Sequence, residues 1–180
     1  MNGPRCAAGA VALLAASIML TGCTSESNHP NAISVRVSPP SSPVQWDPCT
    51  KIADRIPEQF GFDPATRERT NQPDAGASGC RFDRAGGNDI DPSKLGWLTI
   101  MSMTNTMEHW GNLHPDEARV AIDGREAIKI EYERPTACTM VMTGTDGTVS
   151  VRLGGATGTP DWKPCDLIDQ VAQTIEAALP

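Results

Sequence analysis

The chain has 180 residues, with 15 lysines and arginines against 22 aspartates and glutamates and a formal net charge of −7. Its basic residues form no cluster interleaved with aromatic ones, so we expect no nucleic-acid partner, because phosphate binding needs such a patch. The acidic balance also disfavours direct adsorption of the folded part to an anionic membrane surface.

The first 22 residues are typical of an export signal. Arg5 is their one charged residue, and it precedes an apolar run of 14 residues from Ala7 to Leu20. That run is shorter than the about 20 residues that a membrane-spanning helix needs. A positive start, a short apolar core and small residues after it predict a signal peptide over residues 1–22.

The signal ends in Leu20-Thr21-Gly22-Cys23, which resembles the box of bacterial lipoproteins. The resemblance implies that the Cys23 thiol receives a diacylglycerol, that the signal is cut before it, and that the new amino group is acylated, as by palmitate. Two or more acyl chains give stable anchoring. We expect Cys23 to hold the protein at the extracytoplasmic side of the cell membrane; the alternative is an ordinary secretory signal that happens to end in cysteine.

The segment after Cys23 is rich in serine and proline and has no amphipathic period. Such a segment buries too little apolar surface to fold. We predict that residues 23–45 are a lipidated, disordered tether that spans about 25 Å root-mean-square. Residues 46–180 then form one extracytoplasmic domain, whose length suits a single core.

Four cysteines remain in that domain: Cys49, Cys80, Cys138 and Cys165. An even number in an exported domain indicates two disulfides, and no pair has the C-x-x-C spacing of a redox or zinc site. Four cysteines allow three pairings, and the spacing alone does not choose among them. We favour Cys49–Cys80 and Cys138–Cys165, because each bridge would tie the start of a helix to a nearby strand.

Two similar stretches, QWDPC at residues 45–49 and DWKPC at 161–165, mark two helix starts. Asp47 suits the N-cap of the first, and proline suits the first helical position in both. We expect Pro57 to break or kink the first helix and Gly61 to end it. Apolar residues at a spacing of three or four predict an amphipathic second helix over about residues 164–178.

Strand patterns fill the region between the helices. Short or alternating apolar runs predict strands at residues 80–83, 97–103, 126–133, 138–144 and 148–153, and a further run, ARVAI, at 118–122. Asp123-Gly124 and Asp146-Gly147 predict two hairpin turns. The expected fold is α+β, with one antiparallel sheet, an N-terminal helix and a long C-terminal helix packed on it, and two disulfides.

This order of features resembles the actinobacterial lipoproteins grouped as domain-of-unknown-function 3558. The resemblance is carried by LTGC, a polar tether, DPC opening a helix, CRF, CTMVM, and a final PC opening the last helix, and it covers the chain from Cys23 onward. It implies an exported, lipid-anchored envelope protein and no transferable activity. Pro57 and Lys163 depart from the usual pattern at a helix interior and a helix start.

The segment MEHWGNLHPDE holds the chain's other candidate site residues. His109 and His114 lie among carboxylates, but their spacing matches no helical zinc pattern, so we predict a solvent-exposed loop and no metal site. Trp110 is either buried or, with both histidines, directed at a partner.

No phosphate-binding glycine motif and no nucleophile elbow occurs in the sequence. We therefore expect no cofactor and a non-catalytic domain that binds an envelope protein or an apolar ligand. A hydrolase built from carboxylates that meet only in space and a structural surface lipoprotein are the alternatives.

Overall fold

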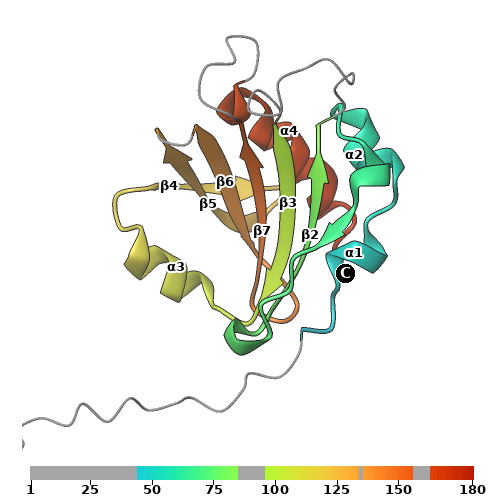
Figure 1. Cartoon of the computed structure of the whole chain (residues 1–180). Coiled ribbons are helices and arrows are strands. Elements are labelled where there is room, and N and C mark those ends of the chain that lie inside the picture. Colours follow the sequence, from blue (N-terminus) through green and yellow to red (C-terminus); the bar gives the residue numbers. More distant parts are fainter. Residues whose placement is uncertain (1–43, 85–95, 134–135, 156–162) are drawn as a thin grey trace, which may run out of the picture. The chain divides into compact units, whose positions relative to one another are not determined.

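A computed structural model describes residues 44–84, 96–133, 136–155 and 163–180, all of which belong to one compact unit (Figure 1). Its centre is a seven-stranded antiparallel sheet with the strand order β1-β2-β3-β7-β6-β5-β4. The strands are β1 (Glu68–Arg69), β2 (Ala77–Asp83), β3 (Trp97–Met103), β4 (Ala118–Ile122), β5 (Arg125–Tyr132), β6 (Ala137–Thr143) and β7 (Thr148–Gly154). Within the described residues, no helix is long and apolar enough to cross a membrane.

The predicted α+β fold and its strands are confirmed, with bounds that move by up to three residues. The strand expected at residues 80–83 begins earlier, at Ala77. Both predicted hairpins are present, because β4 pairs with β5 and β6 pairs with β7. Asp123 and Gly124 have φ values of 48° and 88° in the first turn, the left-handed conformation that a two-residue hairpin turn requires.

Side chains alternate between the two faces of the sheet, and the faces differ in what covers them. On one face, which we call the helix face, the strands contribute the main core together with residues of the C-terminal helix. That core contains chiefly aliphatic and methionine side chains, as the low aromatic content predicts. Its members from the central strands include Ile100, Met140, Val151 and Leu153.

The C-terminal helix α4 (Pro164–Glu176) confirms the amphipathic prediction and ends two residues early. Its buried residues Ile168, Val171 and Ile175 join the main core, and Figure 1 shows the helix running behind the strands. Lys163 at its N-cap makes no side-chain capping bond, whereas Asp47 caps the first helix by accepting from the N–H of Cys49 at 3.0 Å.

The first helical segment is interrupted, but not at the proline that was expected to break it. The chain forms α1 (Pro48–Lys51), turns at Ile52, and resumes as α2 (Arg55–Gln59). Ile52 is buried in the main core, and its extended backbone ends α1. Pro57 lies in the first turn of α2, where its missing N–H costs no helical hydrogen bond. Gly61, with φ of 78°, follows the end of α2 as predicted.

Two disulfides join the helix starts to the sheet. Cys49 in α1 is bonded to Cys80 in β2, and Cys138 in β6 is bonded to Cys165 in α4. The Cα–Cα distances are 4.9 Å and 5.0 Å. The favoured pairing is confirmed, and each bridge links a helix start to a strand residue whose side chain lies on the helix face.

Candidate functional site

The histidine segment is a helix, so the predicted loop is wrong. Thr106 caps α3 (Met107–Leu113) by accepting from the N–H of His109 at 3.2 Å. A helix was not expected because Gly111 and Asn112 are weak helix formers. Packing overrides that weakness, since α3 lies against the face of the sheet opposite α4. Figure 1 shows α3 apart from α4.

Trp110 attaches α3 to the sheet. Its ring packs against a second apolar cluster that contains Ile128 and Val141, and its Nε1–H donates to Oγ1 of Thr148 at 3.1 Å. The His114 ring stacks on the indole with centroids 5.8 Å apart, and His109 meets it edge-on at 6.4 Å. The structure thus brings the three residues together around a half-buried tryptophan, with its polar atom already bonded.

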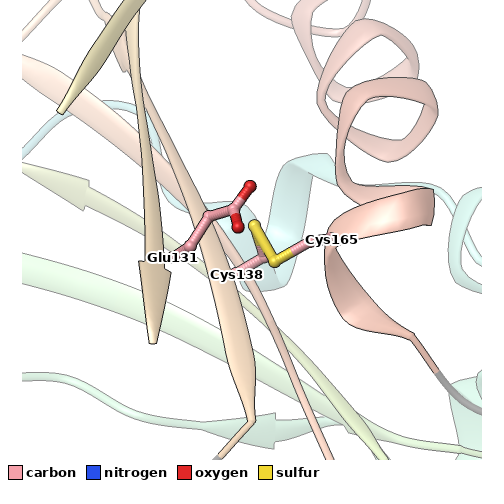
Figure 2. A group of neighbouring side chains, drawn as sticks. All are labelled: Glu131, Cys138 and Cys165. Atoms are coloured by element: carbon pink, nitrogen blue, oxygen red, sulfur yellow. A yellow bond between two sulfur atoms is a disulfide. The ribbon is translucent and has the colours of Figure 1, made fainter. Parts of the chain in front are cut away.

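One group of acidic and sulfur side chains has metal-like spacing among the described residues. Figure 2 shows the Glu131 carboxylate from β5 beside Cys138 from β6 and Cys165 from α4, with ligand atoms within 4.8 Å of one another. A cysteine binds a metal ion as its thiolate, and here the sulfurs of Cys138 and Cys165 are bonded to each other. The group is therefore a carboxylate beside an intact disulfide, with no thiolate to bind a metal.

The sheet face opposite α4 carries a second group, which we call the Arg152 cluster: Trp97, Tyr132, Thr139 and Arg152. Arg152 in β7 pairs with Thr139 in β6, and Gly154 pairs with Trp97 in β3. Directly paired residues, and residues two apart in one strand, share a face. Because Tyr132 pairs with Ala137 and Ala137 with Gly154, the two aromatic residues flank a pair of small ones.

The aromatic side chains lean towards the middle of this face. A Cβ built on Gly154 would collide with Cζ2 of Trp97, so the indole covers the position that glycine leaves open. The guanidinium carbon of Arg152 lies 4.9 Å from the centroid of the Tyr132 ring, a cation–π arrangement. Trp97, Tyr132 and Arg152 are each partly exposed.

Arg152 differs from the other arginines on strands in having no carboxylate partner among the described residues. Each of the four others forms an ion pair with an aspartate or glutamate at 2.8–3.1 Å: Arg69, Arg81, Arg119 and Arg125. In a chain with more acidic than basic residues, an uncompensated guanidinium in the middle of a sheet is unusual. It leaves donors free to bind an external acceptor.

Two buried polar atoms of the Arg152 cluster also lack hydrogen-bond partners within the part of the chain that the structure describes. They are Nε of Arg152 and Oγ1 of Thr139, a residue that is only 5% exposed. Leaving a buried donor or acceptor unpaired costs about 1–3 kcal/mol, so such groups need a reason. Their position on directly paired residues concentrates unused hydrogen-bonding capacity at one point of the sheet.

Sequence reasoning did not find this cluster. Its four residues lie on four strands. Thr139 also lies in a strand that is buried on both faces from Ala137 to Met142, so no alternation marks its position. The sequence offered one indication of the cluster, which is the charged Arg152 between the apolar Val151 and Leu153. The same alternation is found at ordinary solvent-facing positions of a strand, so it does not indicate a site. The neighbours of Arg152 are set by strand order, which the sequence does not show directly.

The geometry defines a class: an α+β domain with one antiparallel sheet, two helix-to-strand disulfides and a partly exposed polar-aromatic cluster on the face away from α4. Residues 18–178 match the model of a family described as protein of unknown function, DUF3558. The chain belongs to that family, as the sequence resemblance indicated. No curated protein and no solved structure matches the chain significantly.

Proposed function

We propose that this protein is a lipid-anchored envelope lipoprotein whose domain binds a ligand or partner through the Arg152 cluster, without catalysis. The observation that carries the binding role is the partly exposed Arg152, which has aromatic neighbours and no carboxylate partner among the described residues. Such a group is suited to bind an external molecule and is of little use as packing.

The anchor is supported by the chain's first segments. The box that ends at Cys23 follows an apolar run of signal length, and a polar tether follows it. The family match begins at residue 18, so it includes this box and the tether as well as the domain. These features support a domain presented outside the cytoplasmic membrane on a flexible segment.

The Arg152 cluster is suited to binding and not to hydrolysis. A hydrolase would need an acid–base pair or a nucleophile with a base near it. The Arg152 cluster itself contains no carboxylate and no histidine.

Replacing Cys23 with alanine is expected to abolish membrane attachment, because the thiol that would carry the diacylglycerol is lost. Fractionation and intact-mass measurement check this. The wild-type protein should begin at Cys23 and carry acyl chains, and the variant should carry none. Cys6→Ala, inside the predicted signal, is the matched control and should leave attachment unchanged. A Cys23→Ala protein that stays fully membrane-bound would refute the anchor.

Radical footprinting on intact cells tests the binding role. If a ligand or partner covers the Arg152 cluster, Trp97 and Tyr132 should be oxidised several-fold less in the cell envelope than in purified protein. Leu113 on α3, which is 58% exposed, should react equally in both and serves as the internal control. Equal oxidation of the two aromatic residues in both settings would contradict the proposal.

A further inference from the structure

We infer that the Arg152 cluster is an oxyanion site for a carboxylate or phosphate carried on a ring or other compact apolar group. This inference rests on the binding role proposed above and specifies the chemistry of its ligand. It follows from three features of the cluster: the charge of Arg152, the two unpaired polar atoms, and the two aromatic rings.

The charge of Arg152 selects the sign of the ligand. The other arginines on strands are neutralised by carboxylates of the chain, whereas Arg152 has no such partner among the residues that the structure describes. A guanidinium presents a planar fork of donors that fits carboxylate and phosphate oxygens in pairs. Because a neutral ligand would leave this charge without compensation, an anion is favoured.

The unpaired atoms select the position of the anion. Thr139 Oγ1 and Arg152 Nε lie on directly paired residues, and neither has a hydrogen-bond partner in the described ranges. Both are buried, so binding requires a small rotation of the Arg152 side chain off the Tyr132 ring. An oxyanion beside the strand pair β6–β7 would then accept from Nε–H and from the Thr139 hydroxyl together, which removes the cost of leaving both unpaired.

The aromatic rings select the body of the ligand. Trp97 lies over Gly154 on one side, and Tyr132 lies under the Arg152 guanidinium on the other. Between them are the small residues Gly154 and Ala137. The Arg81 guanidinium lies 5.1 Å from the centroid of the Trp97 ring, so the apolar walls are the parts of the two rings that Arg81 and Arg152 do not cover. Flat or cyclic groups pack well on such faces, so a bare inorganic anion should bind less tightly than one joined to a ring.

An oxyanion of this kind has two sources outside the membrane. One is a soluble organic acid or phosphate monoester, and the other is the head group of an anionic phospholipid, within reach of a tethered domain. Both present the same acceptor oxygens to Arg152. The shared chemistry is the inference, and the two sources are separated by the experiment.

The test follows the Arg152 Nε–H NMR signal of the full-length lipidated protein in non-ionic detergent. Benzoate and phenyl phosphate should shift this signal in a saturable way, whereas benzamide, the neutral analogue of benzoate, should not. Inorganic phosphate should bind more weakly than phenyl phosphate. Nanodiscs of phosphatidylglycerol compared with phosphatidylcholine test the head-group source, for which the shift should occur only with the anionic lipid.

Matched variants assign the effect to the site. Arg152→Gln should weaken benzoate binding at least tenfold, because the charge and the fork are both lost. Arg152→Lys keeps the charge and should retain part of the affinity, which guards against a variant that merely fails to fold. Arg119→Gln, at an exposed arginine paired with Glu126, should bind as the wild type does.

Two results would overturn the oxyanion site. One is a shift by benzamide equal to that by benzoate. The other is no saturable shift in either the soluble or the nanodisc arm, as expected if Nε–H donates to Thr139 Oγ1 in solution and the pair is closed. Protection of Trp97 and Tyr132 in cells together with either result would leave the binding role standing and reject the ligand chemistry alone.

Discussion

Replacing both Cys138 and Cys165 with alanine is expected to lower the free energy of unfolding by about 3–4 kcal/mol. The bridge closes a loop with a sequence separation of 27 and ties the start of α4 to β6. Without it, the unfolded chain gains conformational freedom that the folded state does not share. Because a domain of this size has a stability of about 5–15 kcal/mol, the loss is a large fraction of the total.

Urea denaturation of the variant and the wild type measures this loss, and the free energy of unfolding should fall with urea concentration at the same slope in both proteins. The matched comparison is Cys49→Ala with Cys80→Ala, whose loop is of similar length, with a separation of 31. Cys80 and Cys138 are both fully buried, so the packing changes are also alike. A loss below about 1 kcal/mol for the Cys138–Cys165 pair would show that the helix start is held by packing and not by the bridge.

Gly147→Ala is expected to destabilise the domain by about 3 kcal/mol or more. Gly147 lies in the turn between β6 and β7 with φ of 147°, a backbone conformation that residues other than glycine rarely adopt. A Cβ there would lie 2.6 Å from the carbonyl oxygen of Met103 and 2.8 Å from that of Asn105. These are backbone atoms, so they cannot move aside as a flexible side chain could.

Gly124→Ala is the matched control for this prediction. Gly124 also has a positive φ, 88°, but its Cβ would meet nothing within 4 Å. The control therefore reports backbone strain alone and should cost about 1 kcal/mol. Thermal or urea unfolding of both variants separates the cost of backbone strain from the cost of the collision between the added Cβ and the backbone. Equal losses would mean that the close approach of Gly147 to the end of β3 contributes nothing.

The turn that contains Gly147 also forms hydrogen bonds with the first residues of the domain. The carboxylate of Asp146 accepts from the backbone N–H groups of Gln45 and Trp46 at 2.8 Å and 3.0 Å. Trp46 is buried in the main core. The Asp-Gly pair that predicted a hairpin thus has a second use, which became visible only when residues a hundred positions apart were placed together.

Local chemistry was enough to predict most elements of this fold. Asp47 and Pro48 predicted a helix start because a capping oxygen and a missing N–H act within one turn. Asp123-Gly124 predicted a hairpin because few residue pairs adopt a left-handed turn at low cost. The pairing of Cys49 with Cys80 was the favoured choice among three, since each bridge was expected to join a helix start to a nearby strand.

The sequence by itself therefore determined the fold class, the presence of two disulfides and the expectation of an anchored, exported domain, because these depend on composition and on neighbours along the chain. Which cysteines pair was decided by the tertiary structure. Only the tertiary structure decided that the histidine segment is helix α3, since its packing on the sheet outweighs weak local propensity. Only strand order brought Trp97, Tyr132, Thr139 and Arg152 to one face. Side-chain contacts across four strands are set by pairing partners far apart in the chain, and alternation within a single strand carries no information about them.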